Sequence, residues 1–521
     1  MLKKLPTFLT LLLICTICLP CFDQTAEATN YYVRNGGSDS AAGTSPTTAW
    51  GNIPGTAASS KSLSPGDVVY CDRDSTWTLS GIVNYYSTWV PEPGVTYNGS
   101  DWEYDGGTSG TRARIEYTGS LVNSEQTSII LFGRDNASYP TTVYGFEIDG
   151  NSREANGVLI KAIYNSSTTI DNGWKVFENN VLHHLTNHCS SGHYNYGIRT
   201  CAATNIWGND GTKQIRYLKI INNTIYHVPR VGIMIYPSPG STNNYERDYI
   251  IRGNDISDIG YDDAGCWSNC GYSWGPAIAI KGFFERVTIE NNYIHGLHQG
   301  GDAILITTPD GAFGTETDMV IRNNIIDCGN TECIMERDYS QGSDADYEFY
   351  GNIVYNGNNS SCNNSGLSVS PSGGTASWKI YNNTFYEAPL RVGSGPFTSL
   401  HVQNNISYGN GSGITVSETG SHVTVSNNLT TNPSFKNTNN HPDGWSGTYE
   451  DGSLAPNKDG LTLVSDSSAA CGTGVNLGSS YNQTIEQAIT RPSSGAWDIG
   501  AYEYRHTLAA PENLKILLSS P

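Results

Sequence analysis

The chain has 521 residues, of which 37% are apolar and 15% charged, and its formal net charge is −20 at pH 7. A chain with such an excess of acids has too few cations to neutralise phosphates, which excludes nucleic acid as an expected partner. An acidic polysaccharide stays compatible with this charge if a metal ion or a local group of basic side chains supplies positive charge.

Residues 1–28 have the pattern of an export signal. Two lysines form a basic start, residues 8–19 are an apolar run, and Ala26-Glu27-Ala28 matches a small-x-small cleavage site. The apolar run is too short to cross a bilayer as a helix. We therefore expect a secreted protein, extracellular or periplasmic, that is monomeric and has no membrane span.

Three of the 12 cysteines leave with this signal, so nine remain in the mature chain. In an oxidising compartment, the short spacings of Cys266/Cys270, Cys328/Cys333 and Cys189/Cys201 predict local disulfides. A zinc site is disfavoured, because the cysteines lack the paired partners of a closed tetrahedral site. The odd number leaves at least one thiol free.

A motif of alternating apolar residues that ends in an asparagine recurs nine times. The asparagines stand at positions 180, 223, 254, 292, 324, 352, 383, 405 and 428. The alternation predicts a strand, and the asparagine marks a bend. A second short strand is predicted in most units, at residues 197–200, 232–236, 277–281, 303–307, 333–337, 366–370 and 413–417.

Such a repeat predicts an all-β fold, a parallel β-solenoid in which the strands of each coil stack on those of the next. The bend asparagines are expected to bond to one another from coil to coil as a structural ladder. Residues of about 30–175 are expected to add irregular coils and an N-terminal cap. The domain then spans residues 29–505, and residues 506–521 form an extension or linker.

The two ends of this domain resemble a known family. YYVRNGGSDSAAGTSPTTAW (31–50) with LSPGDVVY (63–70), and NNLTTNPSF (427–435) with SDSSAACGTG (465–474) and WDIGAYEY (497–504), look like secreted right-handed parallel β-helix proteins of the pectate-lyase-like superfamily. The resemblance implies a right-handed β-helix whose final coils lie near the C-terminus. It also implies a class containing polysaccharide lyases, glycoside hydrolases, epimerases and proteins without known activity.

Ionisable residues concentrate in the middle coils, between residues 180 and 338. Aligning the second strands places Tyr236, Lys281, Thr307 and Arg337 in one column, with Lys281 and Arg337 about 10 Å apart. Lyases of the resembled family use such cations: one basic group removes a proton next to a uronate carboxyl group, and another stabilises the charge. We therefore expect Lys281 as the base and Arg337 as the stabilising cation. An exposed ion-paired role is the alternative for both.

Acidic residues in the same coils suggest a second chemistry. A glycoside hydrolase could draw two carboxylates from Asp262, Asp263, Asp302 and Glu336. Asp262 and Asp263, with Asp338, could instead hold Ca²⁺, which takes oxygen ligands. A solvated turn is the simpler explanation for the adjacent aspartates.

His298 breaks the repeat and is followed by Gly-Gly-Asp, so we expect it to shuttle a proton or bond to substrate. His295 shares a repeated column with His183 and is discounted. The residues expected to contact substrate are Asp302, Glu336, Trp267, Trp274, Tyr236 and Arg230. Together these features favour a lyase acting on a uronic-acid polysaccharide, with a glycoside hydrolase or a non-catalytic glycan-binding solenoid as alternatives.

Overall fold

The computed structural model describes residues 28–84, 86–104, 110–120, 127–133, 138–153, 155–161, 173–185, 202–207, 216–236, 246–260, 275–281, 284–298, 302–308, 316–329, 333–338, 344–356, 366–371 and 375–504. Trp267, Trp274, Asp262 and Asp263 lie outside these residues. In the described part of the chain, no helix is long and apolar enough to cross a bilayer.

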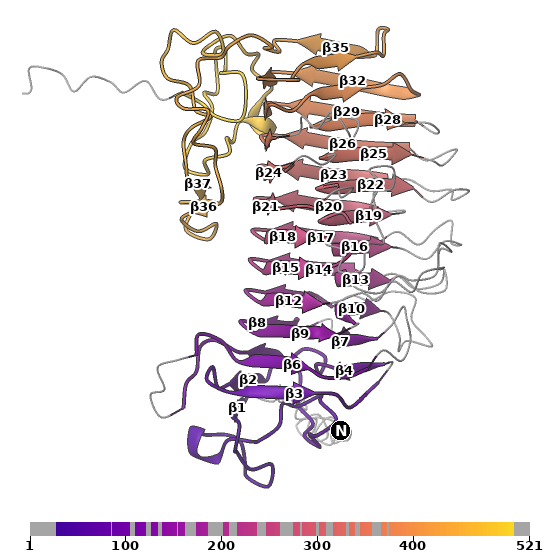
Figure 1. Cartoon of the computed structure of the whole chain (residues 1–521), viewed down its shortest axis with the longest axis vertical. Coiled ribbons are helices and arrows are strands. Elements are labelled where there is room, and N and C mark those ends of the chain that lie inside the picture. Colours follow the sequence, from indigo (N-terminus) through magenta and orange to yellow (C-terminus); the bar gives the residue numbers. More distant parts are fainter. Residues whose placement is uncertain are drawn as a thin grey trace, which may run out of the picture.

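Three long sheets run along one column, and all neighbouring strands within them are parallel (Figure 1). The chain passes from the first sheet (sheet A) to the third (sheet C), then to the second (sheet B), and back to sheet A. One such round, for example β8–β9–β10, is one coil. The predicted right-handed parallel β-helix is therefore confirmed.

The sheets contain 13, 11 and 11 strands. Sheet A is made of β1 (Asn30–Val33), β2 (Val68–Cys71), β5 (Thr96–Asn98), β8 (Thr141–Tyr144), β11 (Lys175–Glu178), β14 (Arg216–Ile221), β17 (Glu246–Arg252), β20 (Phe284–Glu290), β23 (Glu316–Arg322), β26 (Asp344–Tyr350), β29 (Thr375–Tyr381), β32 (Phe397–Gln403) and β35 (Val423–Ser426). Sheet B is made of β4 (Ser87–Trp89), β7 (Ser128–Phe132), β10 (Asn156–Lys161), β13 (Ala202–Trp207), β16 (Val231–Tyr236), β19 (Ile278–Lys281), β22 (Ile304–Thr308), β25 (Ile334–Asp338), β28 (Leu367–Pro371), β31 (Leu390–Val392) and β34 (Ile414–Val416). Sheet C is made of β3 (Thr76–Leu79), β6 (Arg114–Tyr117), β9 (Glu147–Arg153), β12 (Val181–Leu185), β15 (Thr224–Val228), β18 (Asp255–Ile259), β21 (Tyr293–His295), β24 (Ile325–Asp327), β27 (Ile353–Tyr355), β30 (Thr384–Tyr386) and β33 (Ile406–Tyr408).

Alternation along each strand sends every second side chain into a single core. In β20, Val287 and Ile289 are fully buried, whereas Thr288 between them is partly exposed. Because successive strand residues point to opposite faces, the apolar positions of all three sheets meet inside the column. One continuous core therefore runs from Val33 near the start of the helix to Val402 near its end.

The repeated asparagines form the predicted ladder. Each side-chain amide from Asn180 to Asn405 donates to the side-chain oxygen of the next asparagine, at 2.9–3.2 Å. That same oxygen also accepts the backbone N–H of the preceding asparagine. Buried amides need such partners, so these residues serve the fold, as predicted.

The residue before each ladder asparagine holds the bend. Asn291 and Asn323 have φ of 56° and 53°, and Gly253 and Gly351 fill the same place with φ of 67°. Asparagine and glycine are the residues that tolerate this left-handed conformation at lowest cost. The Asn-Asn and Gly-Asn pairs of the motif are thus explained by backbone geometry.

Most predicted second strands match strands of sheet B, but one of them lies outside the described residues. Residues 197–200 were expected to be a strand, yet they lie outside the described residues, and β13 (Ala202–Trp207) fills that place between β10 and β16. The alternation in residues 202–207 is interrupted by small polar side chains. That composition hid the strand from a search for apolar alternation.

The last coil ends at Leu429, which still pairs in parallel with Ile406 of sheet C. The segments at 465–474 and 497–504, which were expected to be final coils, do not continue it. They leave the column and lie against the outer face of sheet C (Figure 1). Leu461, Ile485 and Tyr502 cover Tyr293 and Tyr355. The backbone N–H of Ala501 donates to the hydroxyl of Thr384, and Tyr355 donates to the carbonyl of Pro442. This segment, residues 430–504, is the C-terminal cover; it contains the hairpin β36 (Trp445–Ser446) and β37 (Ala455–Pro456).

The predicted Cys328–Cys333 disulfide is present, and it closes the turn between β24 and β25. Cys71, which is buried, and Cys471 are free thiols among the described residues, which confirms that at least one thiol is free. The other two predicted disulfides involve residues outside the described part of the chain.

Candidate functional site

The predicted cation column exists in the backbone register of sheet B. Lys281 pairs with Thr307, Thr307 pairs with Arg337, and Arg337 pairs with Ser370. Tyr236 belongs to the same column, because Ile235 just before it pairs with Ile280 just before Lys281. Lys281 and Arg337 are therefore two strand spacings apart, about 10 Å, as the sequence predicted.

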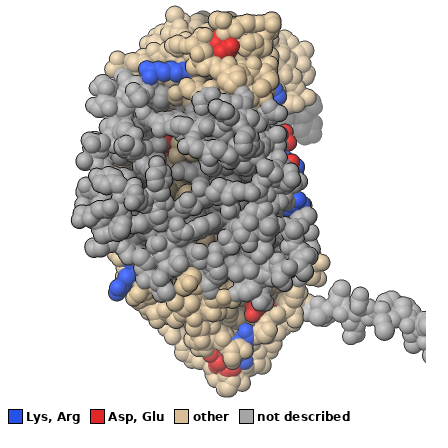
Figure 2. Space-filling model, turned by 90° about the vertical axis from the view of Figure 1, so that its right-hand side faces the viewer, with Lys and Arg blue, Asp and Glu red and all other residues tan. Residues whose placement is uncertain are grey.

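The column lies on the outer face of sheet B where its side chains are described. Ser370 is exposed and Thr307 is partly exposed, whereas Ile306 and Val369 beside them are buried. The structure gives the strand register of Tyr236, Lys281 and Arg337, but their side chains are outside the described part of the chain. Figure 2 looks onto this side of the column, and the described charges visible there are few and scattered.

The predicted carboxylates do not share that outer column. Glu336 pairs with Ile306 and Val369, which are core residues. Asp302 is fully buried just before β22, where its carbonyl accepts the N–H of Ala277. The structure therefore separates both acids from the register of Lys281 and Arg337.

The structure also places two further residues that were predicted to belong to the site, Asp338 and Arg230. Asp338 ends β25 in register with Thr308 and Pro371, and its side chain lies outside the described set. Arg230 is partly buried in the turn between β15 and β16.

His298 belongs to a different line of residues, where sheet C ends. Its Nε2 lies 2.5 Å from one carboxylate oxygen of Asp258, and Nδ1 of His227 lies 2.6 Å from the other. The ring of His227 in turn lies 4.8 Å from the ring of His184. His298 is thus the end of a chain of histidines and one carboxylate that crosses several coils.

Asp258 is the carboxylate that lies between His298 and His227. Burial alone would raise the pKa of its carboxyl group, but hydrogen bonds with His298 and His227 outweigh burial and lower the pKa below its ordinary value of 3.8. The folded protein therefore favours the ionised carboxylate. This stabilisation is complete above pH 3.8 and is lost as the pH falls through the lower pKa of the folded state.

An Asp258→Asn variant tests that assignment. Asparagine suits the left-handed backbone at this position, φ 52°, so mainly the charge is removed. Because the site is exposed, we expect the variant to be about 0.5–1 kcal/mol less stable at pH 6. The difference should shrink towards zero at pH 3, measured by urea unfolding at both pH values. A stability difference that is equal at pH 6 and pH 3 would show that the carboxylate charge is not its cause.

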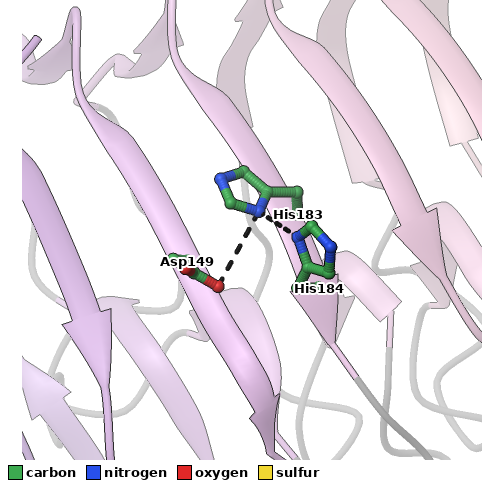
Figure 3. A group of neighbouring side chains, drawn as sticks. All are labelled: Asp149, His183 and His184. Carbon is green, nitrogen blue, oxygen red and sulfur yellow. Dashed lines mark hydrogen bonds and ion pairs between the residues drawn. The ribbon is translucent and has the colours of Figure 1, made fainter.

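The line ends in a cluster that the sequence prediction missed. Asp149 of β9 pairs with His183 of β12, and His184 follows directly (Figure 3). Nδ1 of His183 lies 2.5 Å from Nδ1 of His184 and 3.7 Å from a carboxylate oxygen of Asp149. Burial lowers the pKa of His183, although the carboxylates of Asp149 and Glu147 oppose this. Two imidazoles and a carboxylate therefore face one another, and burial favours the neutral form of His183.

The predicted column of His183 and His295 is correct, since both lie in one register through Tyr226 and Ser257. Nε2 of His295 lies 2.9 Å from a carboxylate oxygen of Asp255. This ion pair fits a structural rather than a catalytic role for His295. The sequence did not reveal Asp149 as the partner of His183. Its coil, YGFEIDGNSRE, lacks the Asn-Asn motif, so it could not be aligned with the other coils. Adjacent histidines at the end of a strand were visible in the sequence, but their partner in the preceding coil was not.

Comparisons with known proteins found no matching family model and no matching curated protein. Solved structures that match include pectate lyase Pel9A, with 15% identity, a TM-score of 0.41 and coverage of 92% of this chain and 97% of that one. The GH136 lacto-N-biosidase from Eubacterium ramulus has 12% identity, a TM-score of 0.42 and coverage of 77% and 68%. The Azotobacter vinelandii mannuronan C-5 epimerase AlgE4 A-module has 11% identity, a TM-score of 0.32 and coverage of 69% and 91%. At these values the similarities assign no reaction; the chain's own three sheets establish its β-helix fold.

Proposed function

We propose that this protein is a polysaccharide lyase that cleaves a uronic-acid-containing polysaccharide by β-elimination on the outer face of sheet B. The observation that carries the proposal is the register column of Lys281, Thr307 and Arg337. The chain has a net charge of −20, so an anionic polymer needs a local group of cations to bind. Two cations aligned in one outer column are such a group. Tyr236 lies in the same column and is proposed to contact substrate, together with Arg230, Trp267 and Trp274.

Each cation has one task in the proposed reaction. The neutral Nζ of Lys281 takes the proton next to the uronate carboxyl group, and the electron pair forms a carbon–carbon double bond. The bond to the glycosidic oxygen breaks, and that oxygen takes a proton from water. Arg337 stabilises the negative charge that gathers on the carboxyl group, since guanidinium binds carboxylate with two hydrogen bonds. Both side chains are long and flexible enough to converge from two strands apart.

Hydrolysis is less well supported. It needs two carboxylates facing one glycosidic bond. Of the four candidates, Asp302 is fully buried and Glu336 shares the register of core residues, so neither lies in the outer column. The positions of these two acids therefore support elimination by cations; the other two candidates, Asp262 and Asp263, lie outside the described residues.

We also propose that Ca²⁺ assists, bound by Asp262, Asp263 and Asp338, because carboxylate oxygens are the ligands that Ca²⁺ takes. Bound calcium would neutralise part of the substrate's carboxylate charge. We expect a chelator to reduce elimination at least about 10-fold, and added Ca²⁺ to restore it. If activity survives chelation unchanged, Lys281 and Arg337 act without the ion.

A substrate panel tests the proposal. The purified protein is incubated with pectate, alginate, a glycosaminoglycan and a neutral plant glycan, and ultraviolet absorbance from unsaturated uronides is followed. We expect absorbance to rise with at least one of the three polyuronides and not with the neutral glycan. No rise with any of the four would contradict elimination as the activity.

A further inference from the structure

We propose that Asp149, His183 and His184 bind one divalent transition metal ion of the class that prefers imidazole ligands, such as Zn²⁺. This site lies on sheet C, and the proposal does not depend on the lyase activity proposed for sheet B. One ligand atom from each of the three residues lies within 4.8 Å of the others, and Figure 3 shows the two rings and the carboxylate turned towards one another.

The ligand set selects the kind of ion. Two imidazole nitrogens and one carboxylate oxygen suit zinc-class ions, whereas Ca²⁺ takes six to eight oxygen ligands. In a tetrahedral site with Zn–N bonds of about 2.0–2.1 Å, two nitrogens are about 3.3 Å apart. The two Nδ1 atoms are 2.5 Å apart, so binding requires the rings to separate by less than about 1 Å. Three protein ligands leave a position open for water or another oxygen ligand.

The surroundings of His183 supply an independent argument. Its other ring nitrogen, Nε2, lies 3.2 Å from a carboxylate oxygen of Glu147. Histidines that bind metals usually donate their second N–H to a carboxylate in this way, which fixes the tautomer and orients the ring. The proton then sits on Nε2, and the lone pair of Nδ1 faces His184 and Asp149. Arg114 forms an ion pair with the second oxygen of Asp149, which holds that carboxylate in place.

The backbone also directs His184 into the cluster. The strand register shifts between His183 and Leu185, and His184 has φ of 53°. In a later coil the same turn position, one residue after His295, is occupied by Gly296 with φ of 58°. Glycine meets this conformation at the lowest cost. The next two coils bend in the same way with other residues, His227 and Asp258, at φ of 55° and 52°. His184 therefore projects from a bend that every one of these coils makes, and it lies next to His183 there.

Metal binding by the full-length chain tests the site directly. After chelation and dialysis, the protein is titrated with Co²⁺, whose visible absorption reports its ligands, and then with Zn²⁺ and Ca²⁺ as competitors. We expect one Co²⁺ per chain, displaced by Zn²⁺ and not by Ca²⁺.

Three variants locate the ion. His184→Gly removes one ligand and suits the left-handed backbone, so we expect affinity to fall by about 100-fold or more while the circular dichroism spectrum stays that of the folded protein. Glu147→Gln should weaken binding about 10- to 100-fold through the orientation of His183. His295→Ala is the matched control, because His295 lies on the same face of sheet C and pairs with Asp255; it should leave affinity unchanged. Absence of stoichiometric binding, or equal affinity in the folded His184→Gly variant, would overturn the proposal.

Discussion

Replacing Lys281 by alanine should reduce elimination by about 10²- to 10⁴-fold, the usual contribution of a general base. The loss should appear in kcat, because the side chain is proposed to accept a proton in the transition state. Replacing Arg337 by alanine should cost about 10²- to 10³-fold, as expected when a group that stabilises developing charge is removed. Initial rates of ultraviolet absorbance with the best polyuronide measure both effects.

The chain offers matched controls for these two variants. Lys161 occupies the same register column as Lys281, three coils earlier, through Trp207 and Tyr236. Arg391 is exposed on sheet B, in register with Ser368 and Thr415 in the neighbouring outer column. Lys161→Ala and Arg391→Ala should keep full activity. If Lys281→Ala and Arg337→Ala are as active as these controls, the site assigned to sheet B is wrong.

Replacing Asn324 by alanine should destabilise the protein by about 3–5 kcal/mol. Its side-chain amide donates to Ile289 and to Asn352, and its side-chain oxygen accepts both the N–H and the side-chain amide of Asn292. All of these groups are buried. The variant therefore loses its own hydrogen bonds and leaves buried donors of Asn292 without an acceptor. Urea unfolding, followed by circular dichroism, measures the loss.

Asn428 is the matched control for the ladder. It accepts the same two hydrogen bonds, from Asn405, but it is the last of the nine asparagines and is only partly buried. Water can replace the lost partner there, so Asn428→Ala should cost about 1 kcal/mol. Equal losses in the two variants would show that burial within the ladder is not the source of its stability.

The fold could be predicted because each coil contains the same backbone bend. A bend with one left-handed residue and one inward asparagine recurs at every round, so Asn292 and Asn324 are visible as a period. The register of sheet B followed from the same alignment. The C-terminal cover could not be predicted in this way, because its short apolar segments pack against Tyr293 and Tyr355 without repeating any backbone pattern.

The candidate sites were only partly predictable for a related reason. Lys281 and Arg337 lie on strands with clear alternation, so their shared column could be read from the chain. Glu336 was expected beside them, but the register assigns it to the core column of Ile306. The Asp149–His183–His184 cluster depends on a coil that lacks the motif, and a contact between coils is invisible without that coil's register.

The most direct test of the central claim compares two products of one reaction. New reducing ends and unsaturated uronide ends are counted in the same digest of the best polyuronide by the wild-type protein. Elimination on sheet B predicts one unsaturated end for every new reducing end, and loss of both in Lys281→Ala but not in Lys161→Ala. New reducing ends without unsaturated ends would mean hydrolysis and would contradict the account.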